Sequence, residues 1–294
     1  MERAVLLVTH GTVDDLADLP GFVTNIRRGS PPPPELIVEL ERRYQAIGGR
    51  SPLNDTTKRL AHKLEQKLGL PVRMASRLWK PLVKDVLAEL GAQEVTVLPM
   101  AQHSSKIYVE AARAAAKALT PSPNVVGVPD WGQTPALLDA FARRIREAVL
   151  ALPSERRARS VLLLTAHSLP MAVLARGDAY EREVRASAAA VASRVRDVLP
   201  DHLVAFQSQG MSEGGGAWLG PDLKETLLRI KQGADKDTVI FAPIGFLADH
   251  VEILFDLDIE ARHWTEAHGL SYARIRSLND DDDFVDLLAG LVAR

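Results

Sequence analysis

The sequence predicts an α/β fold of two similar halves, each a roughly four-stranded parallel sheet flanked by helices. Short apolar runs alternate with longer helical segments along the chain, which is typical of parallel sheets. The second half also repeats the first, because SVLLLT (160–165) is followed by AHS as AVLLVT (4–9) is followed by HGT. We therefore predict an internal duplication with domains over residues 1–152 and 153–294, joined in the polar stretch 151–158.

Size and composition exclude several classes of protein. The chain has 294 residues, of which 46% are hydrophobic, and a formal net charge of −2 without a basic stripe, so a core is expected and a nucleic-acid partner is not. Cysteine is absent, which excludes disulfides, thiolate nucleophiles and Cys-ligated zinc or iron–sulfur clusters. No apolar run approaches the roughly 18 residues of a membrane span. We expect a cytoplasmic protein without membrane insertion.

Each half contains the elements of this fold in order. In the first half, residues 13–33 are expected to be irregular with one helical turn. The first half is then expected to contain strands at 4–8, 72–75, 95–99 and 124–128 and helices at 35–47, 51–68, 80–90, 105–119 and 134–150. The second half is expected to contain strands at 160–165, 202–207, 238–242 and 271–276 and helices at 222–230 and 283–292. The glycine-rich stretch 210–220 between them is interpreted as a mobile loop. Sites in such folds form in the loops after the strands.

The stretch 241–260 begins at the end of a predicted strand and continues into an acidic segment. Glu252, Asp256 and Glu260 are spaced four apart, which at about 100° per residue places them on one helical face. Like charges at this spacing destabilise a helix slightly. The spacing alone fits a solvated acidic face, and it also fits a row of carboxylates that binds a cation or relays protons.

A histidine, His167, lies at the end of the buried apolar strand that opens the second half. It fits a structural residue, but imidazole titrates near neutrality and can also accept a proton or bind a metal. Together with Glu252 it offers one nitrogen and one oxygen ligand, which suits transient binding of a divalent ion better than a closed structural site. His10 and His103 are weaker candidates for a ligand.

Several segments resemble the signature sequences of ferrochelatases, enzymes that insert ferrous iron into a porphyrin. These segments are TAHSLP (165–170), QSQG with WLGPD (207–222), PIGFLADHVEILFDLDIE (243–260), RLWKP (77–81) and GGRSPL (48–53). The resemblance implies two Rossmann-like, chelatase-type domains around a central porphyrin cleft.

The same resemblance assigns roles to residues. It implies that His167 and Glu252 are the catalytic and metal-binding pair on opposite sides of the porphyrin plane, and that Asp256 and Glu260 form a proton or metal relay. Fe(II) would be a substrate, with no permanently bound cofactor and no iron–sulfur cluster. Neighbouring enzymes of the haem pathway are the expected transient partners.

The N-terminal region resembles the bacterial subgroup that uses coproporphyrin III. The similar segments are IRRG with Pro31 (26–31) and ERRYQAIGGRSPL (41–53). Coproporphyrin carries four propionates, so the resemblance implies porphyrin binding by Arg27, Arg43, Tyr44 and Ser51.

One residue departs from that subgroup. His10 stands where the subgroup has a tyrosine that ligates the product iron, so His10 is a further candidate for porphyrin binding. The departure keeps a protoporphyrin IX ferrochelatase open as an alternative. A tetrapyrrole or metal carrier without turnover and a sirohydrochlorin cobalt chelatase are weaker alternatives.

Overall fold

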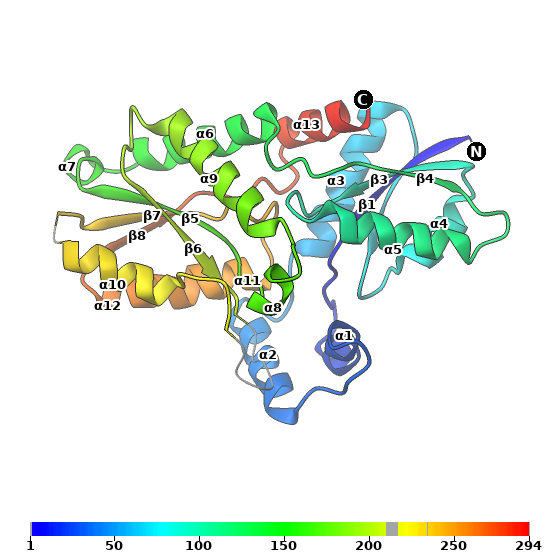
Figure 1. Cartoon of the computed structure of the whole chain (residues 1–294), viewed down its shortest axis with the longest axis horizontal. Helices are drawn as coiled ribbons and strands as arrows, with labels where there is room; N and C mark the ends of the chain where they lie inside the picture. The colour runs from blue at the N-terminus through cyan, green and yellow to red at the C-terminus, as the bar shows by residue number, and fades with distance from the viewer. Residues whose placement is uncertain (1, 210–216, 234, 294) are drawn as a thin grey trace. The chain divides into compact units, whose positions relative to one another are not determined.

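The computed structural model describes residues 2–209, 217–233 and 235–293 and contains two four-stranded sheets, in which all strands are parallel (Figure 1). The first has the order β2-β1-β3-β4 and the second the order β6-β5-β7-β8, so the second half repeats the topology of the first. The strands are β1 (Arg3–Thr9), β2 (Val72–Ser76), β3 (Glu94–Pro99), β4 (Asn124–Gly127), β5 (Ser160–His167), β6 (His202–Gln207), β7 (Thr238–Ala242) and β8 (Ser271–Arg274). The predicted α/β fold is confirmed, with all eight strands within two residues of their predicted ends. Most of the predicted glycine-rich loop, residues 210–216, lies outside the described residues.

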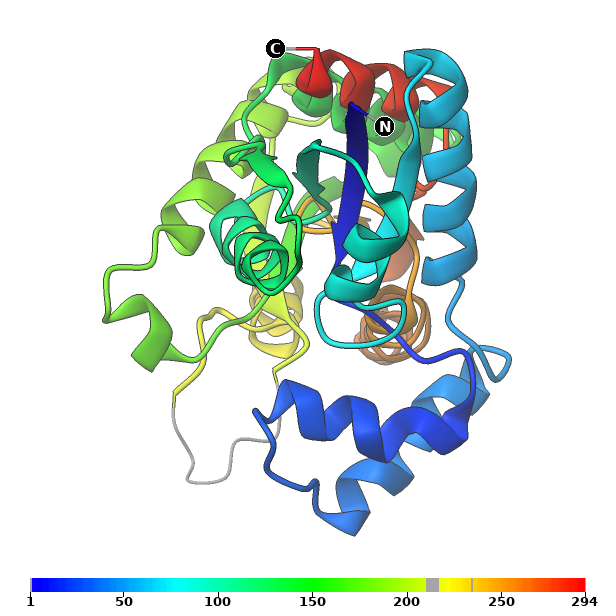
Figure 2. The same ribbon diagram turned by 90° about the vertical axis from the view of Figure 1, so that its right-hand side faces the viewer.

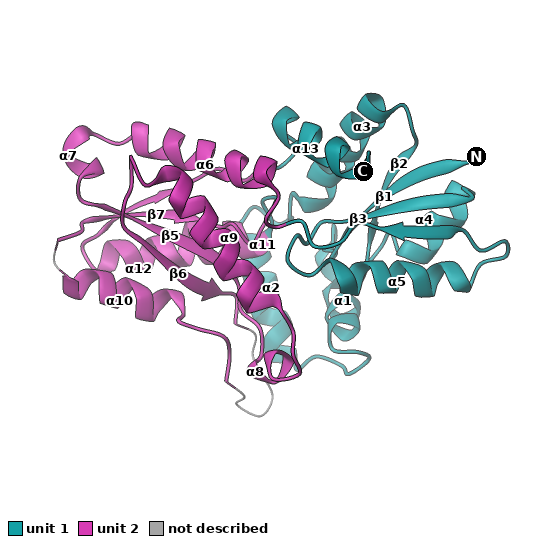
Figure 3. Ribbon diagram, turned by 45° about the horizontal axis from the view of Figure 1, so that its top comes forward, with its two compact units in different colours: residues 1–131, 247–250, 279–294 teal, residues 132–246, 251–278 magenta. Residues whose placement is uncertain are grey.

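The chain divides into two compact units whose bounds differ from the predicted domains 1–152 and 153–294 (Figure 3). Unit 1 contains residues 1–131, 247–250 and 279–294, and unit 2 contains residues 132–246 and 251–278. Two helices account for most of the difference. α6 (Pro135–Leu150) packs on α9 (Tyr180–Val195) and β7 of unit 2, whereas α13 (Asp282–Val292) packs on α3 (Leu53–Leu68) of unit 1.

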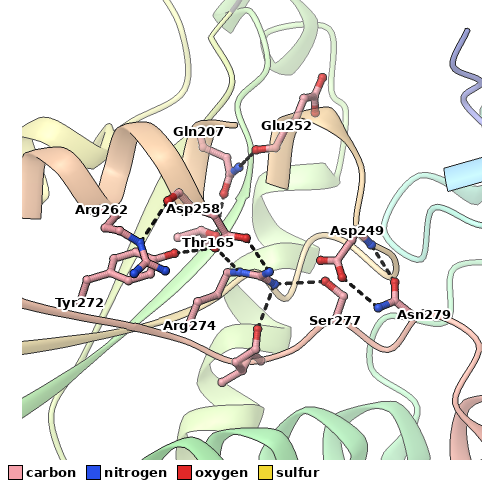
Figure 4. Close-up of polar contacts among 11 residues, drawn as sticks. Thr165, Gln207, Asp249, Glu252, Asp258, Arg262, Tyr272, Arg274, Ser277 and Asn279 are labelled. Carbon is pink, nitrogen blue, oxygen red and sulfur yellow. Dashed lines mark hydrogen bonds and ion pairs between the residues drawn. The ribbon is translucent and has the colours of Figure 1, made fainter. Parts of the chain in front are cut away.

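The short segment 247–250 joins unit 1 through side-chain hydrogen bonds. The Asp249 N–H donates to Asn279 Oδ1 at 2.8 Å, and Asn279 Nδ2 donates to Asp249 Oδ2 at 2.9 Å (Figure 4). The chain therefore passes from one unit to the other more than once. The alternation of strands and helices cannot reveal this, because it does not specify which sheet a helix covers.

In unit 1 the sheet is flanked by helices on both sides. α3 contacts β2 and has α13 beside it (Figure 2), while α4 (Val83–Leu90) and α5 (Ser105–Lys117) pack together with β2, β3 and β4. The strands contribute fully buried apolar side chains such as Leu6, Val8 and Val97 to this core. The segment 13–33, predicted to be mostly irregular, instead contains a short 3-10 turn, η1 (Leu16–Asp18), and a helix, α1 (Leu19–Ile26), which packs on α2 (Pro34–Ala46).

In unit 2, α6 and α9 lie together on one side of the sheet, and α10 (Leu223–Gly233) and α12 (Arg262–Ala267) lie on the other (Figure 1). Leu163, Phe241 and Leu257 are fully buried between the sheet and the second pair. α9 was not predicted from the sequence, because its many alanines give little contrast between apolar and polar faces. The remaining helices are short, namely α7 (Ser154–Arg157), α8 (Met171–Leu174) and α11 (Val251–Leu254).

Each sheet has a topological switch point, between β1 and β3 in unit 1 and between β5 and β7 in unit 2. Ligands of open α/β sheets bind at the carboxyl ends of the strands beside such a point. His10 directly follows β1, His167 ends β5, and α11 follows β7. The fold therefore places the predicted histidines where this architecture builds sites. No helix of the described ranges is long and apolar enough to cross a membrane.

Candidate active site

Hydrogen bonds hold both the imidazole ring and the backbone of His167. Its Nδ1–H donates to the backbone carbonyl of Ser168, and the Tyr180 hydroxyl donates to the His167 carbonyl at 2.9 Å. The Nδ1 contact leaves Nε2 as the atom that can exchange a proton or bind a ligand. About a third of the side chain (35%) is exposed, at the end of an otherwise buried strand.

Glu252 lies in the first turn of α11 and faces this imidazole. Its Oε1 is 3.6 Å from His167 Nε2, and its side chain is also 35% exposed. The structure thus brings together the two residues that the sequence analysis paired, one from the end of β5 and one after β7. The pair provides one nitrogen and one oxygen. In the part of the chain that the structure describes, no group of three or more His, Asp or Glu side chains is arranged to hold a metal ion.

The pair changes the protonation of His167. Partial burial lowers the pKa of the imidazole, but the charge of Glu252, its hydrogen bond and the Ser168 carbonyl together raise the pKa from 6.5 to about 9. His167 is therefore mainly an imidazolium at neutral pH. Because its pKa is raised in the folded state, the pair stabilises the fold fully below pH 6.5, and this contribution is lost as the pH rises through about 9.

Gln207 connects the strand of His167 to the helix of Glu252 (Figure 4). Its Oε1 accepts from Thr165 Oγ1 at 2.8 Å, and its Nε2 donates to the backbone carbonyl of Glu252 at 3.2 Å. Gln207 is only 2% exposed, so both bonds form away from water. Gln207 lies within a signature segment, but the sequence alone predicts no role for it. Its bonds join three separate elements, which no local pattern reveals.

Gly245 brings the turn after β7 close to β5. Its N–H donates to the Thr165 carbonyl at 3.0 Å, and a Cβ atom at this position would lie 2.5 Å from the Ala166 Cβ. A larger residue would push the turn away from the strand. The absence of a side chain at position 245 therefore lets the turn after β7 pass directly beside the residue that precedes His167.

The predicted spacing assumed that the acidic segment is a regular α-helix. The structure shows that it is not. α11 is followed by a π-helical turn, η2 (Asp256–Ala261), in which the Glu260 N–H donates to the Phe255 carbonyl five residues earlier at 2.9 Å. Such wide turns are rare and occur frequently at functional sites. Sequence spacing cannot distinguish a π turn from an α turn, since both place residues four apart near one another.

The interpretation of this segment as a solvated acidic face is wrong for Asp256. Its side chain is 5% exposed and accepts a hydrogen bond from Ser208 Oγ, directly after β6. Ser208 has a left-handed backbone with φ of 59°, a strained conformation for a non-glycine residue of the kind found at functional sites. Glu260 is half-buried. The row therefore runs from the half-buried Glu252 through the buried Asp256 to the half-buried Glu260.

The other predicted site residues belong to unit 1. His10 is exposed, with its ring centroid 6.5 Å from that of Phe22. Gly11 follows with φ of +111°, and a Cβ there would lie 3.2 Å from the Trp79 backbone nitrogen, so glycine lets the loop turn at this point. Arg27 is half-buried at the C-terminal end of α1.

The remaining candidates make hydrogen bonds within unit 1. Arg43 Nε donates to Glu39 at 2.7 Å. The Tyr44 hydroxyl is 2.7 Å from Thr12 Oγ1, and buried Ser51 accepts from the Leu53 N–H at 3.4 Å. These are contacts within the protein, and the roles of these residues in porphyrin binding stay predictions.

The family model described as Ferrochelatase matches residues 2–294. The chain belongs to the ferrochelatase family. The ferrochelatase of Herpetosiphon aurantiacus is 37% identical over 99% of this chain and 98% of its own length. Coproporphyrin III ferrochelatases of Geobacillus kaustophilus and Bacillus subtilis are 33% and 30% identical, over 99% and 100% of this chain and 95% and 97% of their own lengths. This ferrochelatase-family chain is a metal-inserting enzyme.

Solved structures support the fold assignment. SirB from Bacillus subtilis with Fe³⁺ superposes with a TM-score of 0.57 at 14% identity, covering 100% of this chain and 95% of SirB. CbiX, described as the terminal enzyme of sirohaem synthesis in denitrifying bacteria, gives 0.56 at 16% identity, covering 99% of this chain and 98% of CbiX. At these identities the similarity shows a chelatase-type fold alone, as the resemblance of this ferrochelatase-family chain implied.

Proposed function

We propose that this enzyme inserts ferrous iron into coproporphyrin III in the cytoplasm, with Fe(II) as a substrate and no resident cofactor. The observation that carries the proposal is the His167–Glu252 pair, with Nε2 and Oε1 3.6 Å apart beside the switch point of the second sheet. Insertion requires a group that receives the metal and a group that receives the pyrrole protons. An imidazole and a carboxylate at this distance supply both.

The charge of the pair suggests an order of events. In the resting enzyme His167 holds a proton, because Glu252 raises its pKa to about 9. A dication that arrives beside Glu252 cancels this attraction and repels the imidazolium, so the pKa of His167 falls. His167 then releases its proton to water, and its Nε2 becomes available to accept a proton from a pyrrole N–H. The second pyrrole proton leaves through the carboxylates as iron binds the four ring nitrogens.

Asp256 and Glu260 are proposed as the relay beyond Glu252. Asp256 is buried and accepts a hydrogen bond from Ser208, so its carboxylate is held in one position. Carboxylates at successive turns give a cation or a proton a series of stopping points. The π turn between Phe255 and Glu260 adds a wide section of backbone at the place where the relay passes.

One observation, the names of relatives, supports coproporphyrin as the porphyrin. Some of the relatives above are named coproporphyrin III ferrochelatases. Arg27 and Arg43, at the end of α1 and on α2, are proposed to bind propionates together with Tyr44 and Ser51. Since Arg43 already pairs with Glu39, a propionate would share its guanidinium. His10 is proposed as the ligand of the product iron.

The porphyrin preference is tested by anaerobic insertion of Fe(II) by the purified protein, followed by porphyrin absorbance. Protoporphyrin IX lacks two of the four propionates. Since charge-assisted hydrogen bonds contribute about 1.5–3 kcal/mol each, kcat/KM is expected to be about tenfold or more higher for coproporphyrin III. Arg43→Gln is expected to reduce this ratio, and Arg42→Gln, which removes the other guanidinium from Glu39, should preserve it.

Two results would contradict the proposal. Faster turnover of protoporphyrin IX would make the protein a protoporphyrin ferrochelatase. The unusual His10 would then be associated with a preference for protoporphyrin IX. Turnover of neither porphyrin, with tight binding of one of them, would favour a carrier on the same fold.

A further inference from the structure

The π turn is attached to the sheet by Asp258, which lies between Asp256 and Glu260 in sequence. Arg274 Nε donates to Asp258 Oδ1 at 2.7 Å and Arg274 Nη2 donates to Oδ2 at 2.8 Å, a two-bond contact with the carboxylate (Figure 4). The Tyr272 hydroxyl also donates to Oδ1, at 2.9 Å. Both oxygens of Asp258 are therefore bound, and both partners come from β8.

Arg274 is largely buried and makes further hydrogen bonds besides those to Asp258. Its side chain is 13% exposed and that of Asp258 is 25% exposed. The remaining nitrogen, Nη1, donates to the Ile275 carbonyl at 3.1 Å and to Ser277 Oγ at 3.4 Å. A planar guanidinium with five donors suits this arrangement, whereas a lysine ammonium could not make the two parallel bonds.

A third side chain completes the arrangement. Arg262 Nε donates to the backbone carbonyl of Asp258 at 3.1 Å, and its guanidinium lies 4.5 Å from the centre of the Tyr272 ring. Burial, and then the charge of Asp258, raise the pKa of Tyr272 well above its usual value, so the hydroxyl remains a donor at physiological pH. We call Asp258, Arg274, Tyr272 and Arg262 the β8 anchor.

The β8 anchor connects the π turn to the strand of His167. β8 pairs with β7, with Arg274 opposite Phe241, and β7 pairs with β5, which ends in His167. A π turn has less favourable backbone geometry than an α turn and needs contacts that hold it open. The β8 anchor supplies such contacts at the middle of the turn.

We infer that Asp258 and Arg274 are positioning residues, which hold the π turn so that Asp256 and Glu260 keep their places beyond Glu252. The inference rests on the proposed function for the relay role of these carboxylates. If the turn tightened to α geometry, the following residues would rotate by one residue step, about 100° around the axis. Glu260 would then move away from the position that it has in the structure, although none of the three carboxylates had been changed.

The test compares Arg274→Lys with Arg146→Lys in the full-length protein. Arg146 makes a two-bond contact of the same geometry with Asp197, at 2.8 and 2.7 Å, at a more exposed place, and joins α6 to the end of α9 without touching the π turn. Arg274→Lys is expected to raise the KM for Fe(II) about tenfold and leave the KM for porphyrin unchanged, as supporting residues of metal sites typically do. Arg146→Lys should change neither value. Asp258→Asn, which keeps the shape of the side chain, should resemble Arg274→Lys.

Hydrogen exchange provides a second readout that does not depend on activity. Without substrates, the amides of residues 255–261 should exchange about tenfold or more faster in Arg274→Lys than in the wild type, because opening the turn becomes easier. Unchanged exchange of these amides would overturn the inference. The inference would also be overturned if Arg274→Lys kept the wild-type KM for Fe(II) while its thermal stability fell by the same amount as that of Arg146→Lys. If the wild type inserts no iron, the proposed function fails, and the exchange comparison still decides whether the β8 anchor holds the turn.

Discussion

Replacing His167 by alanine is expected to lower the rate of iron insertion by a factor of about 10² to 10⁴, the usual contribution of a positioned acid or base. The variant removes the Nε2 atom that faces Glu252 at 3.6 Å and leaves the backbone of β5 unchanged. Porphyrin binding should persist, because the proposed propionate contacts come from other residues. Single-turnover insertion under anaerobic conditions measures the rate, and quenching of protein fluorescence measures binding.

His202→Ala is the matched control for this variant. His202 is exposed at the start of β6, at the opposite end of the strand from Gln207. This change should leave both insertion and binding at wild-type levels. A wild-type insertion rate in His167→Ala would show that the central assignment is wrong.

Replacing Glu252 by glutamine is expected to have the second largest effect, a decrease in insertion rate by a factor of about 10² or more. The amide keeps the size of the side chain but removes the charge that raises the pKa of His167. That pKa should therefore fall from about 9 toward 6.5. The wild type loses stability as the pH rises between these values, whereas the stability of the variant should be nearly independent of pH over the same range. NMR titration of the imidazole and thermal unfolding at several pH values measure the two effects.

Glu266→Gln, on the exposed surface of α12, controls for the loss of one negative charge. It should leave the rate of insertion and the pKa of His167 unchanged. A carrier protein would show no loss of ligand affinity in Glu252→Gln and no insertion in the wild type. If the pKa of His167 stayed near 9 in Glu252→Gln, another group would have to set it.

The sequence predicted the parts of the structure that depend on local pattern. All eight strands are short apolar runs, and parallel pairing follows from their alternation with helices. His167 and Glu252 could be paired because each follows a strand, and such ends meet at one edge of a parallel sheet. The signature segments added the identity of the chemistry, which the pattern alone left open.

Other features depend on tertiary contacts and could not be predicted. The exchange of α6 and α13 between the halves is set by packing against α9 and α3. The π turn is closed by a bond between residues five apart, and the contact between Asp258 and Arg274 joins residues sixteen apart; no spacing rule reports either of them. Gln207 likewise acquires its role only when β5, β6 and α11 meet.

The central claim is that His167 and Glu252 act as one unit in iron insertion, and the double variant His167→Ala/Glu252→Gln tests it most directly. Residues that act as a unit lose little more together than separately, so its insertion rate should lie within about threefold of the slower single variant. Both single variants and the double variant should be measured with the same porphyrin under anaerobic single-turnover conditions. Losses that multiply in the double variant would show that the two residues act independently and would contradict the account.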